Sequence, residues 1–400
     1  MRLAIVSTYR PRPCGIAVFS SDLRAALVET DSSLAVEIVS IIREDPHTHP
    51  PEVAATIRQD VAGDYAAAAS ELRRRDVDVV LIEHEYGIFG GDCGRFVLTL
   101  ANKLTVPMVV TLHTVLASPS PGQAATLRAL CRRAALVMVF TETARRMVVE
   151  QGLAEFERIR VVPHGTPDIL TAAAWSDRVG EDMTRSSLKL GLPSLAGRKV
   201  LSTFGLISDS KGLELVIRAL PAITAVHPEV VYLIAGQTHP DVINKEGESY
   251  RLGLQRLVHD LDLCDHVSFI DRFLTTDELA MLLARTDLYV TPYRSRDQIV
   301  SGALTYAVAA GCPVVSTPYF YAEDLLSSGA GVLVPFEDTS KLATAVLELL
   351  GSPAKLGGAR AAARRVGADL TWTSVGKATL ETLSEAAHGV RQPAVVAGPR

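Results

Sequence analysis

The sequence KVLSTFGLISDSKGLE, residues 199–214, joins a β-branched run to a helix start through a glycine and a polar loop. A buried strand that turns into a helix in this way is the repeating unit of parallel α/β sheets. The ammonium of Lys211 and the first amides of the helix after Gly212 would meet one anion, because helix N-termini attract negative charge. The spacing differs from that of a Walker loop, so we expect a phosphate site of another kind.

The same alternation extends in both directions. In the second half, strands are expected at 199–204, 230–235, 267–270, 288–291, 314–316 and 331–334, and helices at 212–226, 248–261, 275–285, 302–310 and 339–350. In the first half, strands are expected at 3–7, 36–41, 77–83, 108–113, 136–140 and 159–162, and helices at 17–30, 65–75, 91–104 and 122–134. This βαβα order predicts two parallel sheets, each with helices on both faces.

The chain is therefore expected to form two Rossmann-like, doubly wound α/β domains. We place them at residues 1–180 and 190–370, followed by a C-terminal helix over 371–388 and a disordered tail over 389–400. The irregular stretch 168–197 suggests the boundary. Doubly wound sheets bind ligands beyond the carboxyl ends of their strands, so two such domains facing each other predict a central cleft.

Composition narrows the class of protein. The 400 residues are 48% hydrophobic with a net charge of −5, and a long basic run is absent, which argues against a nucleic-acid partner. The N-terminus reads as a buried strand rather than a signal peptide, and no apolar run has the length of a membrane helix. The five cysteines are scattered and lack a C-x-x-C pair, so free thiols in the cytoplasm are expected.

Two regions of the first half carry candidate residues. Gly15 lies in a loop with Arg10 and Arg12 just before a helix, where it could bind an anion or form an ordinary tight turn. The third strand ends in EHEYGIFGG, residues 83–91, and buried strands do not end in charge without reason. We expect an acceptor site there, with a solvated strand end as the alternative. Its residues are His84, Glu85 and Tyr86.

Histidines follow two further strands of the first half. His113 comes at the carboxyl end of the strand VPMVVTL and could donate or accept a proton near neutral pH. A lone histidine is more often structural than catalytic, and only its position favours a catalytic role here. His164, after IRVVP, is a similar but weaker candidate.

In the second half, residues 291–316 read TPYRSRDQIVSGALTYAVAAGCPVVS. Ser301 and Gly302 look like a helix N-terminus with exposed amides, and Arg294 precedes them. A plain core helix is the alternative, against which the Arg-Ser-Arg-Asp-Gln run argues. Arg251 is expected on the surface as an ion-pair partner.

Taken together, the Gly15 turn, TLHT, VVPHG, FGLISDSKG and LTYAVAAGCPVVST resemble the retaining glycosyltransferases of the GT-B fold, in particular family four. The resemblance covers the chain from its first strand to about Trp372. It implies transfer of a hexose from a nucleotide-diphosphate sugar to a carbohydrate or small-molecule acceptor, without a metal ion or a bound cofactor.

The resemblance also implies roles for single residues. His113 would contact the transferred sugar, and His113, Lys211 and Glu85 are the expected catalytic residues. Gly15 would lie beneath the donor phosphates, Lys211 would hold them, and the amides at Ser301 and Gly302 would meet the distal phosphate. The full set expected to bind the donor is Gly15, Gly205, Lys211, Arg294, Gln298, Ser301, Gly302 and Tyr306.

The sequence also departs from the family pattern. Leu206 stands where the family has an arginine, and Arg294 or Arg296 could substitute for it. The family's two glutamates are replaced by Gln298, which can still bind sugar hydroxyls, and by Tyr306, which cannot grip a ribose as a carboxylate does. These losses put the nucleotide in question.

Three hypotheses therefore stay open. The first is a nucleotide-sugar-dependent retaining glycosyltransferase. The second is a sugar phosphorylase or a transferase that uses a sugar 1-phosphate, which would not need the ribose-binding glutamate. The third is a non-catalytic sugar-binding or regulatory protein that has kept the fold. The sequence leaves the donor sugar, the acceptor and the oligomeric state undetermined.

Overall fold

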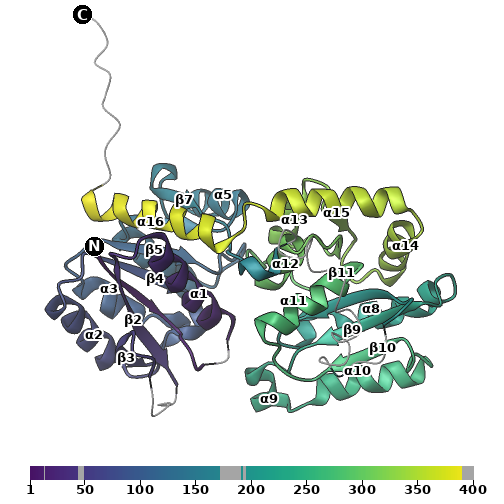
Figure 1. Cartoon of the computed structure of the whole chain (residues 1–400). Coiled ribbons are helices and arrows are strands. Elements are labelled where there is room, and N and C mark those ends of the chain that lie inside the picture. Colours follow the sequence, from purple (N-terminus) through teal and green to yellow (C-terminus); the bar gives the residue numbers. More distant parts are fainter. Residues whose placement is uncertain (13, 44–48, 172–190, 192–194, 390–400) are drawn as a thin grey trace, which may run out of the picture. The chain divides into compact units, whose positions relative to one another are not determined.

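The computed structural model describes residues 1–12, 14–43, 49–171, 191 and 195–389. The chain divides into two compact units, shown with the course of the chain in Figure 1. Unit 1 consists of Met1–Gly165 and the segment that begins at Trp372, and unit 2 consists of Thr166–Thr371.

This division differs from the boundary expected between residues 180 and 190. The chain passes into unit 2 at Thr166, and the C-terminal helix belongs to unit 1 rather than standing apart. Most of the stretch 168–197, and the expected tail beyond Gly389, lie outside the described residues.

Unit 1 is built on a seven-stranded parallel sheet with the order β3-β2-β1-β4-β5-β6-β7. Its strands are β1 (Arg2–Ser7), β2 (Ala35–Ile42), β3 (Val53–Arg58), β4 (Val79–His84), β5 (Met108–Leu112), β6 (Leu136–Val139) and β7 (Ile159–Val161). Strands β4, β5 and β6 are buried throughout, as expected where helices cover both faces of a sheet. The edge strand β3 was not predicted, because its sequence VAATIR lacks a long apolar run. Most of its side chains are only partly buried in the structure.

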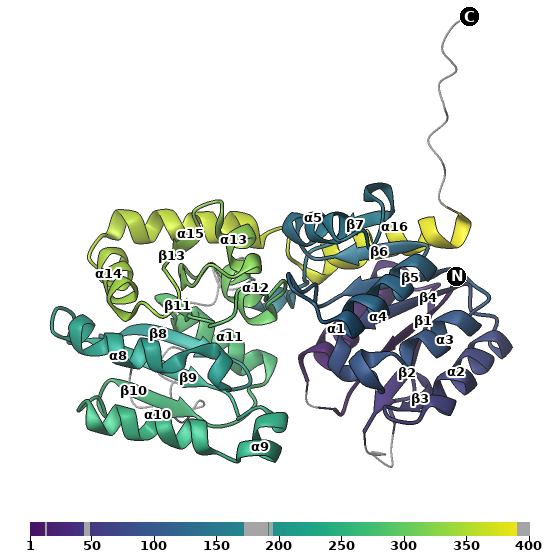
Figure 2. The ribbon, with the colours of Figure 1, turned by 180° about the vertical axis from the view of Figure 1, so that it is seen from behind.

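Helices cover both faces of this sheet. They are α1 (Gly15–Thr30), α2 (Ala62–Arg74), α3 (Val97–Lys103), α4 (Pro121–Arg133), α5 (Glu142–Glu150) and α16 (Trp372–His388), with short 3-10 turns η1 (Tyr86–Ile88), η2 (Asp92–Gly94) and η3 (Phe156–Arg158). Helices α1 and α16 pack together on one face, and α2, α3 and α4 form a row on the other (Figures 1 and 2). The helix predicted over 91–104 is α-helical only from Val97, because Gly91 and Gly94 adopt positive φ angles.

Unit 2 contains a six-stranded parallel sheet with the order β10-β9-β8-β11-β12-β13. Its strands are β8 (Lys199–Phe204), β9 (Val230–Ala235), β10 (Val267–Ile270), β11 (Leu288–Thr291), β12 (Val314–Ser316) and β13 (Gly331–Leu333). The first five match the predicted ranges, and the two parallel α/β units confirm the predicted fold class.

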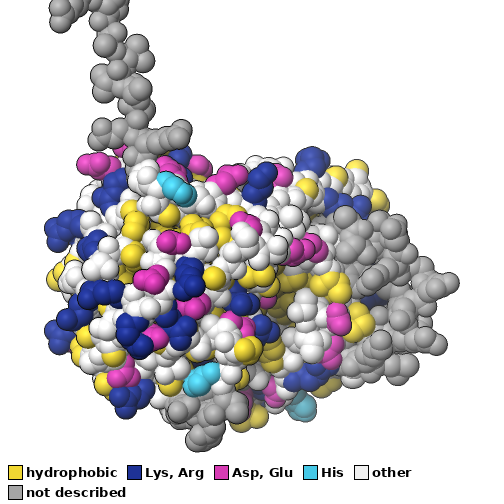
Figure 3. All heavy atoms as spheres, turned by 60° about the vertical axis from the view of Figure 1, so that its left-hand side comes forward, with side chains coloured by type: hydrophobic (Ala, Val, Ile, Leu, Met, Phe, Trp, Pro, Cys, Tyr) yellow, Lys and Arg dark blue, Asp and Glu magenta, His cyan; other side chains and the backbone are white. Residues whose placement is uncertain are grey.

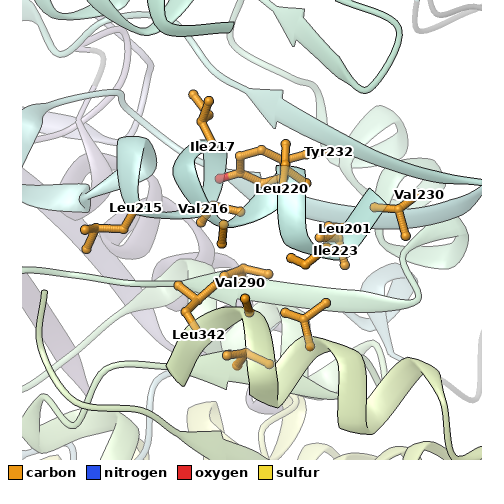
Figure 4. Close-up of a cluster of buried hydrophobic side chains, with 14 of the residues drawn as sticks. Leu201, Leu215, Val216, Ile217, Leu220, Ile223, Val230, Tyr232, Val290 and Leu342 are labelled. Carbon is orange, nitrogen blue, oxygen red and sulfur yellow. The ribbon is translucent and has the colours of Figure 1, made fainter. Parts of the chain in front are cut away.

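The helices of unit 2 are α8 (Leu213–Thr224), α9 (Pro240–Glu246), α10 (Ser249–Asp260), α11 (Thr276–Arg285), α12 (Gly302–Ala309), α13 (Phe320–Leu326), α14 (Thr339–Leu350) and α15 (Pro353–Gly367), with 3-10 turns η4 (Asp168–Leu170) and η5 (Asp209–Lys211). Helix α8 packs against α14 and α10. Figure 4 shows the core between them, where Val216, Leu220 and Ile223 of α8 meet side chains of the sheet and Leu342 of α14. This core fixes the start of α8, and therefore the loop that precedes it.

The surface carries charges of both signs. Figure 3 shows basic and acidic side chains interspersed on the side of unit 1 where α2 and α3 lie, in keeping with a net charge of −5. Within the described part of the chain, no helix combines the length and the apolar character needed to cross a bilayer.

Candidate functional site

In unit 1, the structure joins His113 to a buried glutamate. Strands β4 and β5 are neighbours, and Glu83 lies opposite Thr111 in their register. The His113 Nε2 atom is 2.7 Å from Oε2 of Glu83, and the Thr111 hydroxyl donates to the other carboxylate oxygen at 3.3 Å. Glu83 is 0% exposed and His113 7% exposed. A buried carboxylate needs such partners, because an unpaired buried charge is costly.

The contact with Glu83 fixes the tautomer of a neutral His113 ring. With Nε2 donating to Glu83, a neutral ring keeps its lone pair on Nδ1, which can then accept a hydrogen bond from a hydroxyl. Phe19 and Phe140 pack edge-on against the ring with centroids 5.0 Å away, so its orientation is fixed from several sides. Glu83 belongs to the charged run noted at this strand end, but its pairing with His113 was not predicted.

The neighbouring residues of the EHEYGIFGG stretch lie differently from what we expected. His84 is completely buried between Tyr86 and Phe89, and neither ring nitrogen has a hydrogen-bond partner. Burial lowers the pKa of His84 to about 3, so the ring is neutral. The His84 side chain does not reach the surface in this structure, and its assignment to an acceptor site stays a prediction. Tyr86 is also nearly buried.

Glu85 is the more accessible member of that stretch. It follows β4, is half-buried, and accepts a hydrogen bond from the hydroxyl of Thr114 in the loop after β5. The carboxylate thus links the loop after β4 to the loop after β5, which begins with His113. Its assignment to catalysis and acceptor binding stays a prediction.

The predicted glycine of the first loop begins α1. Cys14 caps the helix, its Sγ accepting from the amide of Ala17 at 3.3 Å, and Gly15 is the first helical residue. Gly15 is exposed, and a Cβ added there would meet nothing within 4 Å. Nothing in the described chain therefore demands a glycine at this place, which is compatible with a ligand approaching the helix start.

His164 has a structural role in unit 1. Its Nδ1 donates to the carbonyl of Gly165 at 2.8 Å, and its ring packs against Phe19 and Trp372. Burial lowers the pKa of His164 to about 4, so the ring is neutral near pH 7. A side chain on Gly165 would overlap the Trp372 ring, which explains the glycine.

In unit 2, Lys211 lies among residues from three segments of chain. Its Nζ atom donates to the hydroxyl of Tyr293 at 2.8 Å and would lie 3.5 Å from a Cβ added to Gly205. Gly205 follows β8, Lys211 ends η5, and Tyr293 follows β11. Gly212 has a φ of 62°, and a Cβ there would overlap the carbonyl oxygen of Pro292, so the two loops touch backbone to backbone.

The predicted helix N-terminus is present beside this group. Ser301 caps α12, its hydroxyl accepting from the amide of Leu304 at 3.2 Å, and Gly302 is the first helical residue. The Ser301 hydroxyl also interacts with the phenol of Tyr293. The structure therefore brings Gly205, Lys211 and the start of α12 together around Tyr293.

Two other predicted residues are engaged within the protein. The guanidinium of Arg294 forms ion pairs with Glu214 and, at 3.4 Å, with Glu337. Arg294 is thus already neutralised and makes a poor replacement for the missing arginine. The amide of Gln298 donates to the carbonyl of Val300 at 2.7 Å, although the residue is exposed.

Tyr306 lies on α12, one face of its ring parallel to that of Phe204 with a centroid distance of 6.5 Å. Its side chain is half-buried at the carboxyl end of β8. An aromatic pair thus occupies the place where the family pattern has a carboxylate.

Arg251 was expected on the surface and is instead buried, with 2% of its surface exposed. Its Nη2 donates to the carbonyl of Gly236 at 2.7 Å and pairs with Asp271 at 2.9 Å. Arg251 therefore fixes the loops after β9 and β10. The expectation was wrong because the sequence did not show that α10 turns this position toward the sheet.

Among the described residues, no group of three or more His, Cys, Asp or Glu side chains could hold a metal ion. The positive charge near the α12 start comes from Lys211 and from the helix itself.

The comparisons with known proteins point to one class of enzyme. Residues 18–168 match the family described as Glycosyltransferase Family 4, and residues 198–352 match the family described as Glycosyl transferases group 1. Each match falls almost wholly within one structural unit.

Curated relatives and solved structures agree with this. Glycogen synthase from Mycobacterium tuberculosis is 28% identical over 312 residues, covering 74% of this chain and 67% of the relative. The GDP-mannose-dependent monoacylated alpha-(1-6)-phosphatidylinositol monomannoside mannosyltransferase from Corynebacterium glutamicum is 27% identical over 203 residues, covering 49% of each chain. The structure of Anabaena HepE in complex with UDP is similar in fold, with a TM-score of 0.73, 17% identity and coverage of 96% of this chain and 100% of that chain.

Proposed function

The chain belongs to the family-four-like glycosyltransferases of the GT-B fold, and we propose that it transfers a hexose from a nucleotide-diphosphate sugar to a carbohydrate or small-molecule acceptor. We further propose that the anomeric configuration is retained and that no metal ion takes part. The five cysteines are free thiols, which supports a place of action in the reducing cytoplasm.

The observation that carries this proposal is the convergence of Lys211, Tyr293 and the Ser301 cap of α12 in unit 2. When the bond between the sugar and the distal phosphate breaks, negative charge develops on the phosphate oxygens. The Lys211 ammonium and the positive end of α12 would stabilise that charge. These groups supply the role that a divalent cation has in other transferases.

The Glu83–His113 pair supports a role for unit 1 in orienting hydroxyls. The free Nδ1 of His113 would accept a hydrogen bond from a sugar hydroxyl, while Glu83 holds the ring in that state. A carboxylate behind a histidine also stabilises any positive charge that the ring gains during the reaction.

A sugar 1-phosphate donor is the second candidate, and the pair formed by Tyr306 and Phe204 favours it. This pair presents rings, not a carboxylate, where a ribose would be bound. One phosphate would require only Lys211 and the amides of α12.

Thermal shifts separate these candidates. A ligand that binds only the folded protein raises the melting temperature by mass action. We expect UDP-glucose or GDP-mannose to raise it more than UDP, GDP, glucose 1-phosphate or phosphate does. A response to sugar 1-phosphates and phosphate alone would support the second candidate. A response to none of these ligands would contradict both.

The matched variants are Lys211→Ala and Lys355→Ala. Lys355 forms an exposed ion pair with Glu348 at 2.8 Å, and its loss should change neither stability nor ligand response. Lys211→Ala should abolish most of the ligand-induced shift and lower turnover sharply while the protein stays folded. Wild-type turnover in Lys211→Ala would remove this lysine from the site. The configuration of the product, followed by NMR, tests retention.

A further inference from the structure

Tyr293 contacts both Lys211 and the start of α12, but the proposed function gives it no role of its own. It follows β11, is 8% exposed, and stacks on Tyr319 with ring centroids 4.9 Å apart and planes inclined by 16°. Its carbonyl accepts a hydrogen bond from the Thr317 hydroxyl at 2.5 Å. Both ends of the residue are therefore held, and its hydroxyl has a fixed place.

That place is between the two cationic features of the site. Lys211 donates to the phenolic oxygen at 2.8 Å, and the same ammonium lies 4.6 Å from the ring centroid. The hydroxyl of Ser301, at the start of α12, also interacts with the phenol. Because the Lys211 ammonium donates to the phenolic oxygen, the phenolic proton points away from the ammonium.

We propose that Tyr293 donates a hydrogen bond to the distal phosphate of the donor substrate, beside Lys211, and so helps to stabilise the leaving group. This inference rests on the proposed function. An anion bound between Lys211 and the start of α12 would lie next to the phenolic oxygen and would receive the phenolic proton as a hydrogen bond. The proton stays on the tyrosine, and no covalent bond to Tyr293 is formed.

The electrostatics of the residue fit this role. Burial raises the pKa of Tyr293, but the Lys211 ammonium and the hydroxyls of Ser301 and Thr291 outweigh burial, so its pKa lies below the ordinary value. A more acidic hydroxyl donates a stronger hydrogen bond to an anion. Burial raises the pKa of Tyr319, which stacks on Tyr293. Among the described residues, no lysine ammonium is one of the groups that act on the Tyr319 hydroxyl, in contrast to Tyr293.

The test compares Tyr293→Phe with Tyr232→Phe. Both changes remove a buried hydroxyl from unit 2 and keep the ring. The Tyr232 hydroxyl donates to Thr203 at 2.8 Å inside the core and shares no hydrogen-bond partner with Lys211 in the described chain. Calorimetric titration with UDP and UMP, and with GDP and GMP, measures the part of the affinity that depends on the distal phosphate.

We expect Tyr293→Phe to weaken binding of the diphosphate about tenfold, the size of one charge-assisted hydrogen bond, and to leave the monophosphate unchanged. In turnover, kcat should fall more than KM rises, because charge on the phosphate is greatest in the transition state. Tyr232→Phe should bind both nucleotides like the wild type. Equal losses for diphosphate and monophosphate, or an unchanged diphosphate affinity, would overturn the proposal.

A spectroscopic measurement distinguishes a Tyr293 that contacts the bound anion from one that only supports Lys211. A tyrosinate absorbance titration of the wild type should show one early-ionising tyrosine that is missing in Tyr293→Phe. Saturating UDP should move that ionisation to higher pH, because a bound anion disfavours the phenolate. A tyrosine that only supports Lys211 would show the early ionisation without the shift.

The outcome for the wild type distinguishes this proposal from the proposed function. If the wild type binds no nucleoside diphosphate but binds glucose 1-phosphate or pyrophosphate, the nucleotide-sugar proposal fails. The same pair of variants, titrated with that anion, then decides the role of Tyr293. If the wild type binds none of these anions, both proposals fall.

Discussion

At the scale of single residues, the charged groups of unit 1 show which sequence signals were informative. Glu83 and His84 are neighbours in a buried strand, but only Glu83 has partners, His113 and Thr111. Adjacent side chains of a strand point to opposite faces of the sheet. Consecutive charged residues of one strand therefore cannot all point into the same site. The sequence showed the cluster, but the face to which each member pointed depended on the pairing with β5.

Replacing Glu83 by glutamine should separate charge from shape. Glu83→Gln keeps the size of the side chain but loses the charge that holds His113, and we expect kcat/KM to fall roughly 10–100-fold, the usual value of a hydrogen bond to a charged group. Steady-state kinetics with the donor identified by thermal shift measure this. Thr111→Val, which removes the weaker partner of the same carboxylate, should have a smaller effect. Wild-type kinetics in Glu83→Gln would argue that the pair is only structural.

Asp22 should make the stability of the protein depend on pH. Burial raises the pKa of Asp22 to about 6, although the Arg10 guanidinium opposes the shift. In the unfolded chain the value is about 3.9. The folded state therefore binds the proton on Asp22 more tightly than the unfolded chain does. The contribution of Asp22 to stability is greatest below about pH 4 and falls as the pH rises from about 4 to about 6.

Asp22→Asn should remove this penalty. Near pH 7.5 the variant should be more stable than the wild type by about 1–2 kcal/mol, and the difference should vanish near pH 4. Urea unfolding at several pH values measures it. Asp31→Asn is the control of opposite sign, because hydrogen bonds from Ser33 lower the pKa of Asp31. A stability difference for Asp22→Asn that did not change with pH would contradict the argument.

At the scale of elements, the loops after β8 and β9 are built as one piece. The amide of Gly205 donates to the carbonyl of Ala235 at 2.9 Å, and the amide of Ile207 donates to that of Gln237 at 2.9 Å. Gly236 has a φ of 141°, and a Cβ there would overlap the carbonyl oxygen of Gly205. The loop that carries Lys211 is therefore held by its neighbour, and Arg251 holds that neighbour through the carbonyl of Gly236 at 2.7 Å.

Two glycine substitutions in unit 2 test this arrangement. Gly236→Ala should displace the Gly205 loop, lower the melting temperature and weaken nucleotide binding. Gly253→Ala lies within α10, where an added Cβ would have only the Arg256 side chain near it, at 4.0 Å. It should stabilise the protein by about 0.5–1 kcal/mol, because alanine is the better helix former. Melting curves with and without UDP distinguish the two. Full nucleotide affinity in Gly236→Ala would show that the loops are independent.

Prediction of helices and strands succeeded where the buried residues of an element are also its apolar residues. The strands of unit 2 were found because runs such as VVYLIA are apolar throughout and are bounded by glycine or proline. Strand β3 and helices α5, α9, α13 and α15 were missed. The sequence ETARRMVVE of α5 is short and largely polar, and its place depends on Thr141, whose hydroxyl caps it at 3.1 Å. Helix start residues were easier to recognise, since Ser301 and Gly302 begin α12 as expected.

At the scale of the whole molecule, the return of the chain to unit 1 was the feature that sequence could not show. The C-terminal helix was predicted, but not its partner. Helix α16 packs along α1, with Gly376 close against Ala26, and begins at Trp372, whose ring lies 5.3 Å from that of Phe19. Such a pairing joins residues far apart in the sequence and is fixed only by the packed fold.

Removing α16 should therefore damage unit 1 alone. A chain ending at Thr371 would expose the face of α1 and leave Phe19 without the Trp372 ring, so the melting transition of unit 1 should move to lower temperature. The transition of unit 2 should stay where it is. Scanning calorimetry of this chain and of a control ending at Gly389 measures both. An equal loss in both transitions would show that the two units melt as one.

The two passages between the units have a practical consequence. The amide of Thr166 donates to the carbonyl of Leu370 at 2.7 Å, and Thr166 forms a parallel bridge with Thr371. Unit 2 is thus one continuous segment of chain whose first and last residues, Thr166 and Thr371, lie side by side. A short graft of a few residues could close unit 1 without it, and a cassette from a relative with another sugar preference could be spliced in at the same two peptide bonds.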